Sequence, residues 1–156
     1  MARWLGIDHG TKRIGIAAGN LADRIATPLA VIPAQPLASA IRQVLKLAED
    51  YGAEGIVVGW PLNMDGSEGP QAKLAMAAAG ELERATGLDV RLWDERLSSF
   101  EADEALAGKL TRKKKRERQD AVAAAAMLHD FFSSGGPQRA QKPRETPPSG
   151  KAPQEK

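Results

Sequence analysis

The order of strand and helix patterns along the chain constrains its fold more than any other feature. Three short apolar segments come first, and two helical patterns then alternate with two more strands before a last pair of helices. We expect strands over residues 4–7, 14–18, 27–32, 55–59 and 90–93. We expect helices from 37 to a C-cap at Gly52, from Pro70 to Gly87, from a capping box at 98–101 to Gly108, and over 120–132. The helix that Pro70 opens should bury Leu74, Ala77, Ala78 and Leu82.

This order predicts an α/β domain built on a five-stranded mixed sheet with helices on both faces. The short Gly10–Arg13 turn joins the first two strands, so they should form an antiparallel hairpin, whereas the later βα units add parallel strands. The ribonuclease H-like fold has this plan, although several unrelated domains could share the same order of elements.

Glycine and proline at 135–137 are expected to end the folded part of the chain. Residues 135–156 contain five prolines and no aliphatic residue larger than alanine, so they cannot bury enough surface to offset their ordering entropy. We therefore predict one domain over 1–134 and a disordered tail over 135–156. The tail carries five basic and two acidic side chains, whereas the rest of the chain carries 17 and 18, so the total charge alone does not indicate a nucleic-acid partner.

The absence of cysteine limits the chemistry open to this chain. It excludes disulfides and thiolate zinc sites, and with two histidines an imidazole-rich metal site is also disfavoured. A metal would be hard and held by oxygen, as Mg²⁺ and Mn²⁺ are. No apolar run is long enough to span a membrane, and a charge occurs too early for a signal peptide, so we expect a cytoplasmic protein without membrane contact.

Carboxylates lie at the ends of elements in three separate parts of the sequence. Asp8 ends the first strand, where a buried charge is costly unless it is paired or binds a metal, although it could also cap the turn at Gly10. Asp94 and Glu95 follow the fifth strand; only one of them should face Asp8, unless both belong to a strand-end cluster of ion pairs. Asp120 begins the last predicted helix, where an N-cap role is the alternative.

The first turn and a basic run are candidates for contact with phosphate groups. The turn after the first strand exposes backbone N–H groups and the hydroxyl of Thr11, with Lys12 and Arg13 beside it. Six cations in seven residues precede Asp120, which suits a site that grips a polyanion, although a charge run is more often a solvated surface. The candidate ligands of nucleic acid in this run are Arg112, Lys113, Lys114, Lys115 and Arg116.

A long loop over 60–70 follows the fourth strand, at the edge where α/β sheets bind ligands. Asn63, Asp65 and Ser67 could contact a phosphate, a sugar or a metal-bound water. An ordinary turn that leads into the next helix is the alternative.

Four segments form a specific pattern when they are taken together. They are Leu5–Ala17, Val57–Pro70, Asp94–Ala102 and the alanine-rich helix from Asp120 to Phe131. In order and spacing they resemble the YqgF family of RuvC-like Holliday junction resolvases, which are also described as pre-16S rRNA nucleases, over about residues 3–132. Trp60, Ser99 and Gln119 depart from the residues usual at their positions, but none of these departures removes a carboxylate.

The resemblance implies a ribonuclease H-like fold and hydrolysis of phosphodiester bonds. It places the family's catalytic carboxylates on Asp8, Asp94, Glu95 and Asp120. Typical ribonuclease H-like nucleases have an acid at the end of the fourth strand, but here that segment is Gly59-Trp60-Pro61. The second carboxylate must then come from the next strand, which we expect to lie farther from Asp8 than metal chemistry prefers.

The expected mechanism uses two Mg²⁺ or Mn²⁺ ions about 4 Å apart, one to activate water and one to stabilise the leaving oxygen. Asp8, Glu95 and Asp120 would hold them, and Glu95 is favoured over Asp94. Asp94 would bind metal or orient Arg96, which could instead pair with a phosphate. The favoured substrate is precursor 16S rRNA, cut to mature its 5′ end, with branched DNA as the alternative, and the expected state is a monomer or weak homodimer.

Two other classes of function remain open from the sequence. Asp8-x-Gly10-Thr11 also suggests an actin-like or sugar-kinase-like nucleotide binder, but such proteins need two lobes and this chain supplies one. A non-catalytic RNA-binding factor in ribosome assembly would need only the basic run.

Overall fold

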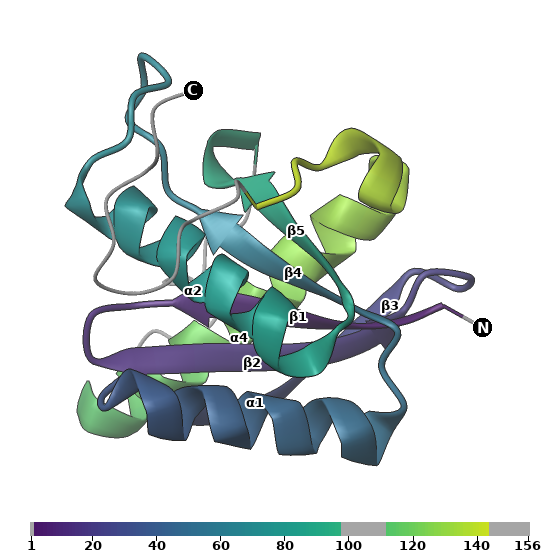
Figure 1. Cartoon of the computed structure of the whole chain (residues 1–156), viewed down its shortest axis with the longest axis horizontal. Helices are drawn as coiled ribbons and strands as arrows, with labels where there is room; N and C mark the ends of the chain where they lie inside the picture. The colour runs from purple at the N-terminus through teal and green to yellow at the C-terminus, as the bar shows by residue number, and fades with distance from the viewer. Residues whose placement is uncertain (1, 98–111, 144–156) are drawn as a thin grey trace.

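A five-stranded mixed sheet forms the centre of the molecule (Figure 1). The computed structural model describes residues 2–97 and 112–143, with the backbone alone at 97, 112–119 and 138–139. The strands are β1 (Arg3–His9), β2 (Arg13–Asn20), β3 (Ile25–Pro33), β4 (Gly55–Trp60) and β5 (Asp89–Asp94). Their order in the sheet is β3-β2-β1-β4-β5. β1, β2 and β3 pair antiparallel, whereas β4 and β5 run parallel to β1, which confirms the predicted mixed sheet.

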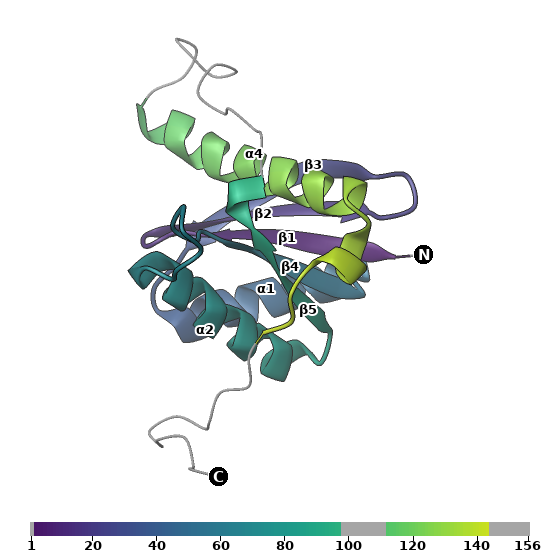
Figure 2. The same cartoon turned by 90° about the horizontal axis from the view of Figure 1, so that it is seen from above.

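Helices cover both faces of the sheet, as predicted (Figure 2). On one face lie α1 (Leu37–Tyr51) and α2 (Pro70–Thr86), and α4 (Arg112–Ser133) crosses the other. Pro70 opens α2, because proline tolerates the first helical turn. Gly52 and Gly87 end α1 and α2 in the left-handed conformation, with φ of +63° and +70°.

Alternation of side chains along the strands produces a hydrophobic core on each face. The core against α1 and α2 includes Leu5, Ile7, Ile56, Val58 and Leu92. The core against α4 includes Trp4, Val57, Trp93, Leu128 and Phe131. Because successive strand residues point to opposite faces, Asp8 lies on the α4 face with Trp4, and Gly59 lies there with Val57.

Two glycines allow α4 to lie directly against the backbone of the sheet. A Cβ added to Gly6 would come 3.0 Å from Cβ of Leu128, and a Cβ added to Gly15 would overlap the backbone of Asp120. Gly15 is also the register partner of Asp8 across the β1–β2 pair. The close approach therefore brings Asp120 over the carboxyl end of β1.

The last helix begins at Arg112 rather than at residue 120, so the predicted start is wrong. Asp120 lies inside α4 and is not its N-cap. The apolar periodicity that we used begins only at residue 121. The arginines, lysines and glutamate before it are good helix formers and extend the helix without adding to that pattern.

The buried face of α2 is made of smaller side chains than predicted. Leu74, which we expected to be in the core, is 47 % exposed, and Ala77 is also exposed. Ala78 and Leu82 are buried as predicted, and the other buried positions are Ala72, Ala75, Met76, Ala79 and Gly80. Alanines let the helix axis approach the sheet closely, so the larger Leu74 is left outside.

The segment after α4 differs from the predicted tail at its beginning. Residues 136–141 continue along β5, where Gln141 exchanges two backbone hydrogen bonds with Leu92 and Arg91 donates to the carbonyl oxygen of Pro137. Backbone pairing of this kind needs no apolar side chain, so composition did not reveal it. Residues 144–156, and the helix predicted over 98–108, lie outside the described residues. No helix in the described ranges is both long and apolar enough to span a membrane.

Candidate active site

Asp8 and Glu95 meet on the α4 face, at the carboxyl ends of β1 and β5. Glu95 follows β5 in a short 3-10 helix, η1 (Glu95–Leu97), and its carboxyl group lies over Gly59 of the intervening strand β4. A Cβ added to Gly59 would collide with Oε2 of Glu95. A hydrogen bond joins the side chains of Asp8 and Glu95. The expectation that this second carboxylate lies too far from Asp8 is therefore wrong. Gly59 of β4 has no side chain, so Glu95 can extend over it to reach Asp8.

Burial and nearby charge raise the pKa values of both carboxyl groups. Burial is the largest cause and raises the pKa of Asp8 to about 6, with the charge of Asp120 adding to the rise. Burial, followed by the charge of Asp8, raises the pKa of Glu95 to about 7. The raised pKa values allow the pair to keep one shared proton up to a higher pH than isolated carboxyl groups would.

Asp120 is the third carboxylate of this group, but it has a cationic partner of its own. Arg13, the first residue of β2, donates from Nε to Oδ2 of Asp120 over 2.6 Å. The two side chains are 31 % and 28 % exposed, so the ion pair lies at the solvent edge of the site. Arg13, which we predicted as a phosphate ligand, thus lies within the carboxylate group itself.

The donor set of this group suits a hard divalent cation such as Mg²⁺ or Mn²⁺. Asp8, Glu95 and Asp120 offer carboxylate oxygens, and a cation would offset the cost of ionising the two buried groups. Among the residues that the structure describes, no three Asp, Glu, His or Cys side chains are already arranged to hold a metal ion. Asp120 is instead paired with Arg13.

Asp94 binds Arg96. Its carboxylate accepts hydrogen bonds from Nε and Nη2 of Arg96, at 3.0 and 2.6 Å, and from the backbone N–H of Arg96 at 2.9 Å. The hydrogen bonds from Arg96 lower the pKa of Asp94. Nη1 of Arg96 donates to the carbonyl oxygen of Met64, over 3.1 Å. The sequence left two roles open for Asp94, binding a metal or orienting Arg96. In the structure Asp94 orients Arg96, and Arg96 in turn braces the loop between β4 and α2.

The loop between β4 and α2 is also braced from within. Asp65 accepts hydrogen bonds from the backbone N–H and the hydroxyl of Ser67, and the amide nitrogen of Asn63 donates to the same hydroxyl. Asn63 is exposed, as a ligand of nucleic acid must be, although part of its amide is used in this network. Met64 is 88 % exposed. The loop therefore presents a fixed surface beside the carboxylates.

The other predicted ligands of nucleic acid belong to two segments at the same end of the sheet, the β1–β2 turn and the beginning of α4. Thr11 and Lys12 are exposed in the turn between β1 and β2. Residues 112–116 form the first turns of α4, and their side chains lie outside the described residues. Figure 2 shows the beginning of α4 and the β1–β2 turn at one end of the molecule, where β1 also reaches its carboxyl end.

Sequence reasoning missed two determinants of the site. The signal for Gly59 was present, because a glycine inside an apolar strand often marks a close approach of another group. The pairing of Arg13 with Asp120 left no local signal, since the two residues are 107 positions apart.

His9 follows Asp8 in sequence but belongs to the opposite face of the sheet. It is 8 % exposed, and burial lowers its pKa, which favours the neutral form. Its Nδ1 has no hydrogen-bond partner among the described residues. His9 is therefore outside the carboxylate group.

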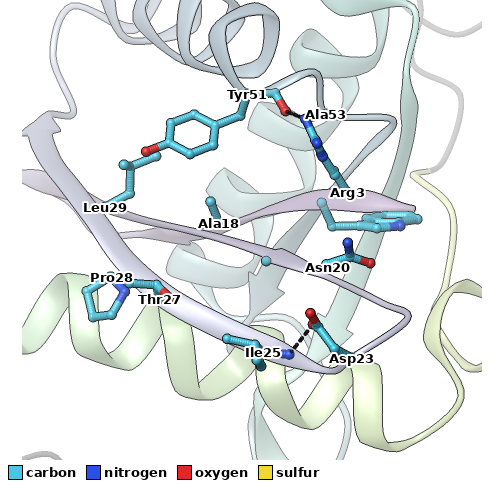
Figure 3. A pocket seen from close by; sticks show the side chains of 12 residues that line it. Arg3, Ala18, Asn20, Asp23, Ile25, Thr27, Pro28, Leu29, Tyr51 and Ala53 are labelled. Carbon is cyan, nitrogen blue, oxygen red and sulfur yellow. Dashed lines mark hydrogen bonds between the residues drawn. The ribbon is translucent and has the colours of Figure 1, made fainter. Parts of the chain in front are cut away.

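A separate cavity of about 410 Å³ lies at the other end of β1 and β2 (Figure 3). Arg3, Asn20, Asp23, Ile25, Leu29 and Tyr51 are among its lining residues. Its polar groups are engaged locally, because Arg3 donates to the carbonyl oxygen of Tyr51 and Asp23 accepts from the backbone N–H of Ile25. The cavity contains none of the predicted site residues.

The sequence of this chain matches known proteins over most of its length. The family described as "RuvX: Holliday junction resolvase" matches residues 2–134. A protein of Anaeromyxobacter sp. (strain K) named "Putative pre-16S rRNA nuclease" is 41 % identical over 136 residues, which are 86 % of this chain and 99 % of that protein. A protein of Paracoccus denitrificans (strain Pd 1222) with the same name is 44 % identical over 124 residues, or 79 % and 78 % of the two chains.

The structure is similar to resolvases of known structure. The RuvC of Thermus thermophilus, solved in complex with a Holliday junction substrate, superposes with a TM-score of 0.54 at 17 % identity, covering 90 % of this chain and 99 % of that one. The fowlpox virus Holliday junction resolvase gives a TM-score of 0.50 at 12 % identity, with 85 % and 99 % covered. At such identities the similarity shows the fold alone, and it confirms the predicted ribonuclease H-like fold.

Proposed function

This chain belongs to the RuvX family, and on that premise we propose that it is a metal-dependent nuclease acting in 5′-end processing of precursor 16S rRNA. The observation that carries the proposal is the meeting of Asp8 and Glu95 over Gly59, with the charge of Asp120 close enough to raise the pKa of Asp8. Three carboxylates from β1, η1 and α4 thus belong to the same region of the fold, and we propose that a bound cation would draw them together. The cytoplasm is the compartment in which it would meet this RNA.

Asp8, Glu95 and Asp120 would hold Mg²⁺ or Mn²⁺, which supplies activation of water and stabilisation of the leaving oxygen when bound. A cation held by all three carboxylates would require the Asp8–Glu95 pair to release its shared proton, and it would compete with Arg13 for the oxygens of Asp120. Thr11, Lys12 and Arg13 in and beside the first turn would hold backbone phosphates, and Arg96 would keep the β4–α2 loop in place beside them.

Precursor rRNA is favoured as the substrate because both relatives named above carry that substrate in their names. The basic segment over 112–116 supports any nucleic-acid substrate equally, since contacts to phosphate position a strand without specifying its sequence. A four-way DNA junction is the alternative, because the structurally similar RuvC was solved with one.

Carboxamide variants of the site test this function. Asp8→Asn and Asp120→Asn should each reduce cleavage of precursor 16S rRNA in Mg²⁺ by at least about 100-fold, because even outer partners of a metal contribute roughly 10–100-fold. Asp50→Asn removes an exposed carboxylate from α1 and should cut at the parent's rate. Cleavage of RNA and of a DNA junction at the parent's rate by the first two variants would refute the nuclease assignment.

A non-catalytic role in ribosome assembly is the second candidate. Two observations favour it: Asp120 is paired with Arg13, and the described residues offer no group of three arranged to hold a metal ion. Expression of Asp8→Asn in cells with a 16S-processing defect separates the two candidates. Restored processing would favour the binding factor, and a persistent defect, with the variant protein present at normal abundance, would favour the enzyme.

A further inference from the structure

Arg13 forms an ion pair with Asp120, one of the three carboxylates on which the proposed metal site depends. The ion pair of Arg13 with Asp120 joins β2 to α4, and about a third of each side chain is exposed to solvent. Within the described part of the chain, the guanidinium donates a hydrogen bond only through Nε. Its Nη1 and Nη2 groups can therefore donate hydrogen bonds to a further anionic partner without first breaking another contact.

A divalent cation and a phosphate would act on this ion pair in opposite ways. The cation competes with the guanidinium for the oxygens of Asp120 and is repelled by its charge. A phosphate instead offers the planar guanidinium two oxygens at once, which is the geometry that arginine binds most strongly. A nucleic acid that placed a phosphate here would draw Arg13 away from Asp120.

We propose that Arg13 is a positioning residue that holds Asp120 out of the metal site until a substrate phosphate takes its place. Released from Arg13, Asp120 completes the cation site with Asp8 and Glu95. The inference rests on the proposed function and deepens it, since it makes metal binding depend on the presence of substrate. Because coupling between two ligands is reciprocal, bound metal also strengthens the binding of nucleic acid.

Binding of Mn²⁺ to the intact chain without nucleic acid, followed by electron paramagnetic resonance, tests the first half of the proposal. Arg13→Gln should bind Mn²⁺ at least about fivefold more tightly than the parent, the lower end of typical coupling between sites. Arg42→Gln removes the same charge from an exposed position on α1, away from the site, and should change the affinity by less than about twofold. Arg13→Lys keeps a cation beside Asp120 and should restore an affinity close to the parent's.

Binding of a labelled RNA oligonucleotide in EDTA tests the second half. Arg13→Gln should bind the RNA more weakly than the parent, since a phosphate ligand is lost. Asp120→Asn should bind it more tightly than Asp8→Asn does. Both variants remove one carboxylate from the site, but only Asp120→Asn sets Arg13 free.

The outcomes separate this inference from the function on which it rests. Equal Mn²⁺ affinity in Arg13→Gln and the parent overturns the role of Arg13 and leaves the nuclease proposal standing. A gain in affinity that persists when Arg13→Gln is combined with Asp120→Asn also overturns it, because the effect would then be one of charge alone. Absence of Mn²⁺ binding in every folded variant, checked by thermal unfolding, overturns the metal site and this inference together.

Discussion

At the scale of single residues, the Asp8–Glu95 pair ties the charge of the site to the stability of the fold. Both carboxyl groups are substantially buried and their pKa values are raised, so each is easier to ionise in the unfolded chain than in the folded protein. As pH rises from the unfolded pKa towards the folded one, the unfolded chain loses its proton first. The free energy of unfolding must therefore fall over this range.

Glu95→Gln should remove the part of this fall in the free energy of unfolding that comes from Glu95, because a carboxamide does not titrate. The variant should match the parent near pH 4 and exceed it above pH 7, by about 1–3 kcal/mol at pH 8, since one pKa unit corresponds to roughly 1.4 kcal/mol. The window follows from a pKa raised from 4.5 to about 7. Urea unfolding at several pH values measures the difference, and a constant difference across pH would contradict the shared proton.

The contact of Asp94 with Arg96 makes a different prediction, about the loop between β4 and α2. Asp94→Asn should weaken the hold of Arg96 on the carbonyl of Met64 and speed amide exchange in residues 63–67 by about 5–10-fold, the worth of roughly one hydrogen bond. Asp89→Asn, which disturbs the ion pair with Arg91 at the other end of β5, should leave these amides unchanged. Equal exchange in both variants would contradict the bracing role of Arg96.

The sequence was sufficient to select candidate carboxylates but not their partners. Asp8, Glu95 and Asp120 could be selected because each belongs to a motif of neighbouring residues. The choice of Glu95 over Asp94 now has a physical reason, because Asp94 binds Arg96 while Glu95 crosses Gly59. The partnership of Arg13 with Asp120 joins β2 to α4, so it could be found only after the sheet and the helix were placed against each other.

At the scale of elements, glycine positions set how close α4 and Glu95 come to the sheet. Gly15 faces the backbone of α4, whereas Gly59 faces the end of a side chain. A backbone neighbour cannot move without moving the helix, but a glutamate side chain can rotate. The same substitution at the two positions should therefore have different effects.

Gly15→Ala should destabilise the protein by about 1–3 kcal/mol or more, as overpacking of a tight core does, and lower its melting temperature. Gly59→Ala should cost less stability but displace Glu95, so nuclease activity should fall while the melting temperature stays closer to the parent's. Thermal unfolding and cleavage assays on both variants give the comparison. A larger loss of stability at Gly59 than at Gly15 would contradict these contacts.

Alternation and periodicity were enough to predict the sheet and the helices that pack on it, since burial produces both patterns. They failed at Arg112, because the beginning of α4 has no apolar pattern, and at 136–141, because that segment is held by backbone pairing with Leu92. Leu74 was misplaced because the periodicity of α2 fits more than one face when most of its small residues are alanine.

At the scale of the whole molecule, positive charge is concentrated in one segment, residues 112–118, which the proposed nucleic-acid substrate would contact. The basic run at 112–118 begins α4, which leads to Asp120 at the carboxylates. A polyanion held along this helix would thus be directed towards the site, and the contact should depend strongly on salt.

Replacing Lys113, Lys114 and Lys115 by glutamine should weaken RNA binding and lower the slope of log affinity against log salt by about 2 to 3, since each phosphate contact contributes roughly 0.7–0.9. Replacing Lys46, Lys73 and Lys142, which are exposed and lie outside α4, changes the net charge equally and should leave the slope near that of the parent. Fluorescence anisotropy over a range of KCl concentrations measures both. Equal slopes in the two triple variants would remove the basic run from the binding surface.

The pairing of Gln141 with Leu92 also affects how copies of this chain can meet. A mixed sheet has two outer strands, and each offers unpaired backbone groups to a second sheet. On β5 the chain's own C-terminal segment takes up the N–H and the carbonyl of Leu92. On β3, Pro28 and Pro33 lack the N–H that a new strand would need. Each border of the sheet thus carries a feature that works against edge-to-edge pairing of two copies.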